Sequence, residues 1–159
     1  MRYYMKSKFF KLKEDFWIKN DQKEKVYFVD NKFLTMGLQF DISKGNEILY
    51  YVKEKLLTFM SKYEIFEQDK VIAKVKQKVT IFREKIEVES KYGNLEIVGS
   101  IFDYNYRIYQ NKKEIAHVAK EIFSFTDNYY IDINFEDEAF ILCLVVIVDN
   151  IIDKNNSAS

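Results

Sequence analysis

Residues 135–153 read FEDEAFILCLVVIVDNIID, and this stretch decides the fold. Its apolar residues do not alternate with polar ones, and residues 139–148 are apolar throughout. Asn134 can cap a helix at this point, and the acidic residues that follow suit the positive end of a helix dipole. The β-branched run 145–148 would equally suit a strand, so length and capping decide for a helix over 135–153, about 28 Å long. A helix without a polar face must be surrounded on all sides.

Upstream of this helix, the chain repeats one unit at a spacing of 23 residues, shortened to 20 in the last step. Each unit has a valine, a second apolar residue about ten positions earlier, and a polar turn between them. Apolar segments separated by such turns are typical of β-hairpins. We therefore expect five hairpins, with further strands near 3–10 and 129–133. The valines are Val29, Val52, Val75, Val98 and Val118, and their partners are Ile18, Ile42, Ile65, Val88 and Ile108.

About a dozen strands in an open sheet would leave exposed edges, so closure into a barrel is favoured. A barrel of that size is too wide for its own side chains to fill, and the apolar helix can occupy the interior. We expect a mainly β fold: a closed barrel of about twelve mostly antiparallel strands around one central hydrophobic C-terminal helix. The expected domain is 1–154, with 155–159 as a disordered tail.

The chain resembles the bacterial LURP-one-related family over nearly its whole length. The resemblance rests on the opening RYYMKSKFF at 2–10, on the Val-x-x-Lys units at 29–33, 52–56 and 75–79, and on YIDI at 130–133 before the helix. It implies the fold of the tubby C-terminal-like superfamily, a twelve-stranded barrel around a hydrophobic helix. Relatives there include the tubby domain, which binds phosphoinositide headgroups, and the phospholipid scramblases. The resemblance supplies no catalytic residues.

Composition narrows the functional classes. The chain has 159 residues, of which 48% are hydrophobic and 31% charged, which favours a folded domain over disorder. A single cysteine excludes a disulfide scaffold and, with no export signal at the N-terminus, indicates a reducing cytoplasm. Headgroup binding would place the protein peripherally at the inner membrane face. The run 139–148 is about half of what a transmembrane segment needs. With 25 basic and 25 acidic residues there is no overall attraction to nucleic acid, so any anionic partner requires a local patch.

Lysines at outward positions of the middle hairpins are the strongest candidate for such a patch. If their strands are neighbours, they form a surface suited to anionic phospholipid headgroups, each cation contributing about 1 kcal/mol. The competing interpretation is a solvated face that prevents edge pairing, with nearby glutamates neutralising the charge. The candidate ligand-binding residues are Lys53, Lys55, Lys74, Lys76, Lys78, Arg83 and Lys85.

A polar residue stands two positions after each repeated valine, where strict alternation would place it inside the barrel. Either a bulge redirects these side chains, or the strands reach the rim of the barrel there, or the residues line a ligand pocket beside the helix end. The rim is the favoured interpretation. The residues are Asn31, Glu54, Gln77, Ser100 and Lys120.

Other chemistry-bearing residues predict neither a metal site nor catalysis. The acidic run at 132–138 lacks the glycine and the bidentate Glu of a calcium loop, so helix capping explains it better. His117 has no second metal ligand or nucleophile beside it in the sequence, and Cys143 is expected to be an inert core thiol. We therefore expect no cofactor and no enzymatic activity.

Two alternatives to a lipid-binding module remain from the sequence. Exposed aromatic residues could mark a partner surface of a protein-interaction or scaffold domain. An enzyme acting on lipid is the less favoured alternative, because no nucleophile and base are recognisable. The aromatic residues in question are Phe123, Phe125, Tyr129 and Tyr130.

Overall fold

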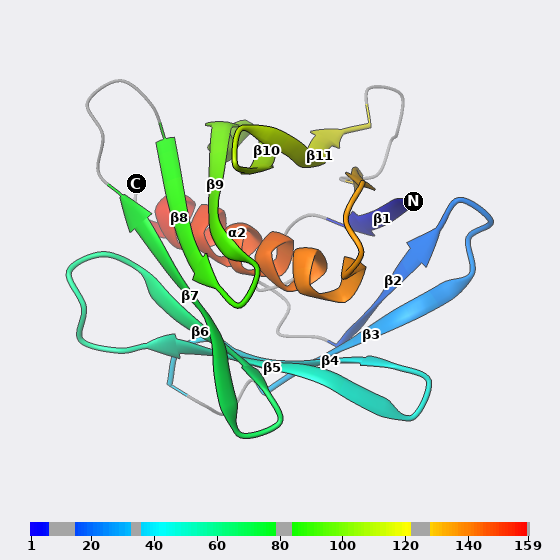
Figure 1. Cartoon of the computed structure of the whole chain (residues 1–159), viewed down its shortest axis with the longest axis horizontal. Helices are drawn as coiled ribbons and strands as arrows, with labels where there is room; N and C mark the ends of the chain where they lie inside the picture. Colours follow the sequence, from blue (N-terminus) through cyan, green and yellow to red (C-terminus); the bar gives the residue numbers. More distant parts are fainter. Residues whose placement is uncertain (7–14, 33–35, 79–83, 122–127, 159) are drawn as a thin grey trace.

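A computed structural model describes residues 1–6, 15–32, 36–78, 84–121 and 128–158. The described chain forms twelve strands, one short 3-10 helix and one long helix (Figure 1). The strands are β1 (Arg2–Lys6), β2 (Phe16–Asn20), β3 (Lys25–Asn31), β4 (Gln39–Lys44), β5 (Glu47–Lys55), β6 (Lys62–Glu67), β7 (Lys70–Lys78), β8 (Glu84–Ser90), β9 (Gly93–Ser100), β10 (Asn105–Gln110), β11 (Lys113–Lys120) and β12 (Asn128–Ile133). The helices are η1 (Ile101–Asp103) and α2 (Glu138–Ala158).

The strands form one closed antiparallel barrel in chain order. Each strand pairs with its predecessor and its successor, and β1 pairs with β12 to close the ring. At the closure Tyr3 lies opposite Ile131. The five predicted hairpins are β2–β3, β4–β5, β6–β7, β8–β9 and β10–β11, and the prediction of a closed barrel is confirmed.

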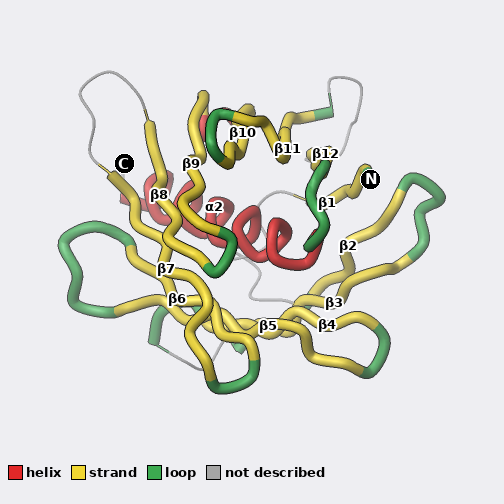
Figure 2. Tube along the Cα trace, in the orientation of Figure 1, coloured by secondary structure: helices red, strands yellow, loops and turns green. Residues whose placement is uncertain are grey.

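The helix α2 occupies the interior of the barrel, as Figure 2 shows in red inside the strands. Every residue from 139 to 152 is buried, including the polar Asp149 and Asn150. The predicted inward residues of the first strand of each hairpin, such as Ile18 and Ile108, are fully buried against it. Burial of this many large apolar side chains is the main stabilising contribution to the fold.

The helix boundaries differ from the prediction of 135–153. Asn134 does not cap the helix; its backbone N–H bonds the Ile115 carbonyl at 2.8 Å and so continues the pairing beyond β12. Asp137 is the capping residue, because its Oδ1 accepts the backbone N–H of Phe140 at 3.0 Å. At the other end, residues 155–158 continue as helix instead of forming the expected disordered tail.

One predicted core position is also wrong. Val98 lies opposite Lys85 and Arg107 on the outer face, and its neighbour Ile97 points inward instead. The cause is a missing β-bulge. The other four hairpins each shift register by one residue directly after their first inward isoleucine, whereas β8–β9 pairs without a shift.

Candidate functional site

The predicted lysines of the middle hairpins share one outer face of the barrel. Strands β5, β6 and β7 are direct neighbours, and alternation turns every second residue outward. The register places Lys62 between Lys55 and Lys76, and it places Glu64 between Lys53 and Lys74. Six lysines in the halves of these strands nearest the end of α2 are called the lysine face: Lys53, Lys55, Lys62, Lys74, Lys76 and Lys78.

Glutamates offset part of the charge of the lysine face: the register places Glu64 opposite Lys53 and Lys74, and Glu87 opposite Lys76. Lys55 forms an ion pair with Glu64 at 3.0 Å, and Lys78 forms one with Glu87 at 3.3 Å. The other four lysines form no ion pair with a described residue. Lys62 was missed from the sequence because it falls outside the 23-residue series; only the strand register reveals it.

Acidic strands border this face on one side. Lys85, a predicted site residue on β8, pairs with Glu96 at 2.8 Å and with Glu87 at 3.6 Å. The hydrogen bond that the Lys85 ammonium donates to Glu96 raises the pKa of Lys85 above its ordinary value. Lys85 therefore lies beside the lysine face in a region where basic and acidic side chains pair with each other. Arg83, the remaining predicted residue, lies outside the described part of the chain.

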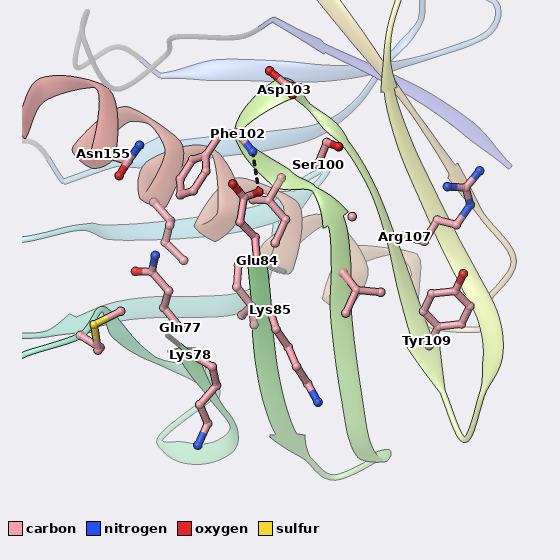
Figure 3. Close-up of a pocket in the computed structure, with 16 residues that line it drawn as sticks. Gln77, Lys78, Glu84, Lys85, Ser100, Phe102, Asp103, Arg107, Tyr109 and Asn155 are labelled. Carbon is pink, nitrogen blue, oxygen red and sulfur yellow. Dashed lines mark hydrogen bonds between the residues drawn. The ribbon is translucent and has the colours of Figure 1, made fainter. Parts of the chain in front are cut away.

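A groove of about 820 Å³ opens where this border reaches the rim of the barrel (Figure 3). It lies between β8, β9, η1 and the end of α2, and the Glu84 carboxylate holds its wall by accepting the Phe102 backbone N–H at 3.2 Å. Its size would suit a small ligand. Its polar lining residues include Gln77, Lys78, Lys85, Ser100, Arg107 and Asn155.

Carboxylates neutralise much of the charge in this groove. Arg107 pairs with Glu114 at 3.2 Å, and Lys85 is held by Glu96. Arg107 was not predicted from the sequence, although its place before the inward Ile108 is a signal for an outward side chain. The arrangement leaves Lys78 as the residue shared by the groove and the lysine face.

The five polar residues that follow the repeated valines are the last or last but one residues of β3, β5, β7, β9 and β11, at the mouth where α2 ends. Ser100 and Lys120 are exposed and Gln77 is half-buried, in line with the rim interpretation. Asn31 and Glu54 are buried. Glu54 accepts the Leu38 backbone N–H at 2.9 Å and also binds Lys154 of α2, so it stabilises the structure.

Acidic residues at the opposite mouth hold the start of α2. The second oxygen of Asp137 accepts hydrogen bonds from the hydroxyls of Tyr50 and Tyr92, and Glu138 accepts one from Tyr3. Asp132 pairs with Arg2 across the barrel closure at 2.6 Å. These contacts agree with the capping interpretation of the acidic run. Within the described ranges, no group of three or more His, Cys, Asp or Glu residues is arranged to hold a metal ion.

A buried carboxylate lies deeper in the barrel. Asp149 on α2 is 1% exposed, and its oxygens have no hydrogen-bond partner of ordinary geometry among the described residues. Burial raises the pKa of Asp149 to about 7, although an interaction with the Tyr104 hydroxyl lowers it in part. Burial raises the pKa values of the Tyr106 and Tyr129 hydroxyls, and the Asp149 carboxylate raises them further.

The remaining candidates have structural contacts. Cys143 is completely buried, and burial raises the pKa of its thiol, which makes it a poor nucleophile. His117 lies edge-on to Tyr130. Tyr129, expected to be exposed, is buried against Tyr104, so that expectation was wrong. The other two aromatic candidates, Phe123 and Phe125, lie outside the described residues.

A closed antiparallel barrel filled by its own C-terminal helix defines the structural class of this protein. The family model for LURP-one-related proteins matches residues 1–149, and the chain belongs to this family. The X-ray structure of a protein from Arabidopsis thaliana superposes with a TM-score of 0.68 at 16% identity, covering 94% of this chain and 91% of that one. It shares the fold. No curated protein matches the chain in sequence. No helix within the described residues is long and apolar enough to cross a membrane.

Proposed function

We propose that this protein is a non-enzymatic binding module that docks on anionic phospholipid headgroups at the inner face of a membrane. The observation that carries the proposal is the lysine face, in which three lysines on three adjacent strands, Lys55, Lys62 and Lys76, are direct neighbours. Neighbouring cationic side chains repel one another. An anionic lipid surface can neutralise all of them together.

The distribution of charge supports an extended surface over a single deep ligand site. In the groove, Lys85 and Arg107 already have carboxylate partners within 3.2 Å. On the lysine face, Lys53, Lys62, Lys74 and Lys76 have none among the described residues. Neighbouring lysines without ion-pair partners can bind several headgroups at once, and each lysine contributes about 1 kcal/mol.

Cosedimentation with phosphatidylcholine vesicles, with and without phosphatidylserine, tests the proposal. Binding is expected to require phosphatidylserine and to weaken as salt rises, because salt screens exposed charges. The pair Lys76→Glu and Lys78→Glu is expected to weaken binding by about 30-fold or more, since two contributions of about 1 kcal/mol are lost and two repulsions are added.

The matched control is the pair Lys19→Glu and Lys113→Glu. These exposed lysines lie on β2 and β11, away from the lysine face, and the reversal changes the net charge by the same amount. It is expected to leave vesicle binding within about twofold. If both double variants lost the same vesicle affinity, net charge alone would explain the effect. Absence of vesicle binding by the wild type would overturn the proposal.

A protein-interaction domain is the alternative function. Such a domain would bind its partner through aromatic residues such as Tyr130 instead of through the lysine face, and it would not distinguish vesicles with phosphatidylserine from vesicles without it. A partner retained after the Lys76→Glu and Lys78→Glu reversals, and lost after Tyr130→Ala, would favour that alternative.

A further inference from the structure

The loop between β5 and β6, residues 56–61, exposes large apolar side chains. Leu57 is fully exposed, Phe59 is 98% exposed, and the adjoining Leu56 is nearly half exposed. The loop projects at the left of Figure 1, at the end of the barrel where α2 ends. Single exposed apolar residues need no explanation, but a leucine and a phenylalanine at one tip mark an interaction surface.

The loop has a defined structure that holds these side chains outward. The Thr58 hydroxyl donates to the Met60 carbonyl at 2.7 Å, and the Gln77 backbone N–H of β7 donates to the Ser61 carbonyl at 3.0 Å. Lys154 of α2 reaches the Ser61 hydroxyl at 3.4 Å. The tip is therefore attached to a neighbouring strand and to the core helix.

The backbone at the tip is strained. Leu57 has φ 58°, in the left-handed region that a side chain with a Cβ disfavours by roughly 1 kcal/mol. Folding gains nothing in return, because the Leu57 side chain is in solvent. Strain that displays an apolar side chain is expected where that side chain has a partner.

A further exposed apolar residue, Met36, precedes a segment that packs against the loop. Gly37 packs so closely on it that a Cβ at residue 37 would come within 2.7 Å of Leu56 Cδ2. Met36, which immediately precedes that contact, is 79% exposed. The apolar tip thus draws on two chain segments.

The lysine face adjoins the base of this tip on one side. Lys55 and Lys62 are the residues that flank the loop and lie opposite each other, and Lys76 lies opposite Lys62. An apolar tip beside the lysine face is complementary to an anionic bilayer. The headgroups can bind the lysines while the acyl region accommodates the tip. A second copy of the chain would bring the same lysines face to face, and like charges repel.

We propose that the 56–61 loop inserts into the interfacial region of an anionic bilayer, with Leu57 and Phe59 reaching the acyl chains while the lysine face binds headgroups. The inference rests on the proposed function and adds to it an apolar anchor. The anchor supplies a component of affinity that salt does not screen.

Vesicle binding separates the anchor from the lysine face. The pair Leu57→Ser and Phe59→Ser is expected to weaken binding about tenfold or more on phosphatidylserine vesicles, while the remaining binding keeps its salt dependence. The pair Lys76→Glu and Lys78→Glu is expected to reduce the salt dependence instead. The control pair Ile48→Ser and Val71→Ser changes exposed apolar residues at the opposite mouth and is expected to leave binding unchanged.

The depth of the tip is measured by fluorescence. Trp17 is the single tryptophan, so Trp17→Phe combined with Phe59→Trp places one reporter at the tip. On phosphatidylserine vesicles its emission is expected to shift to the blue and to be quenched by acyl-chain bromine. Vesicle binding without a shift or quenching would overturn the insertion and leave the proposed function standing; no vesicle binding at all would overturn both. A loop variant that dissociates a dimer would reassign the tip to self-association.

Discussion

The ammonium group of Lys154, near the end of α2, binds the buried carboxylate of Glu54 at the end of β5. The same carboxylate accepts the backbone N–H of Leu38 at 2.9 Å. One side chain thus joins the helix, a barrel strand and the segment before β4 at the mouth of the barrel where α2 ends.

Breaking this contact from either side should have unequal costs. Lys154 is about half exposed, so Lys154→Met is expected to lower the free energy of unfolding by only about 1 kcal/mol. Glu54→Ala also leaves the Leu38 N–H without its partner and is expected to cost about 2 kcal/mol more. Urea unfolding of both variants and their combination gives the coupling energy. A coupling of zero would show that the two side chains do not interact.

The buried Asp149 makes stability depend on pH. Its folded-state pKa is about 7, well above the ordinary value near 3.8, so the folded protein binds the proton more tightly than the unfolded chain does. The contribution of this group to stability is therefore greatest below about pH 4 and is lost as pH rises to about 7.

Asp149→Asn removes this loss, because an amide carries no charge at any pH. The variant is expected to be more stable than the wild type at pH 8, by up to about 4 kcal/mol at about 1.4 kcal/mol per pKa unit. The advantage should shrink towards zero near pH 4. Thermal unfolding of both proteins across this range measures it, and a difference independent of pH would contradict the assignment to Asp149.

Asp137 combines a helix cap with two tyrosine hydroxyls. Asp137→Ala is expected to destabilise the protein by about 2–4 kcal/mol, since it removes the bond to the Phe140 N–H and leaves Tyr50 and Tyr92 without their acceptor. Asp137→Asn keeps a capping oxygen and is expected to cost less than half as much. The free energies of unfolding of the two variants are compared in urea. Equal losses would mean that the charge of Asp137, and not its capping oxygen, stabilises the fold.

Gly99 is required by a close backbone approach. It has φ 137°, and a Cβ there would lie 2.7 Å from the Asn105 carbonyl oxygen and 2.9 Å from Tyr106 Cα. Gly99→Ala is expected to cost about 3 kcal/mol or more, because both obstacles are backbone atoms. Gly93 also has a positive φ but open space around it, so Gly93→Ala is the control and should cost about 1 kcal/mol. Similar melting temperatures for the two variants would argue against the clash.

The fold was predictable because its two signals are long. The apolar stretch of α2 has no face that water could solvate, and the alternation around residues such as Val52 and Ile65 is regular over several residues of each strand. Val98 was misplaced because a β-bulge shifts the alternation by one residue. The hydrophobic pattern does not reveal that four hairpins contain this bulge and that β8–β9 lacks it.

The candidate site was predictable only in part. Alternation placed Lys74, Lys76 and Lys78 outward, as the structure has them. Which residues lie beside them depends on cross-strand register, so the neighbour Lys62 and the bordering Glu87 could not be assigned from spacing alone. The apolar tip was missed for a different reason: in a sequence, an exposed leucine looks the same as a buried one.

Because α2 follows β12 in the chain, a ribosome releases all twelve strands before it releases the segment they enclose. Until then the inner sides of the strands have nothing to pack against, and the nascent polypeptide is a ligand for chaperones. A premature stop codon anywhere before residue 138 would therefore yield a product for proteolysis, whatever number of hairpins it had completed.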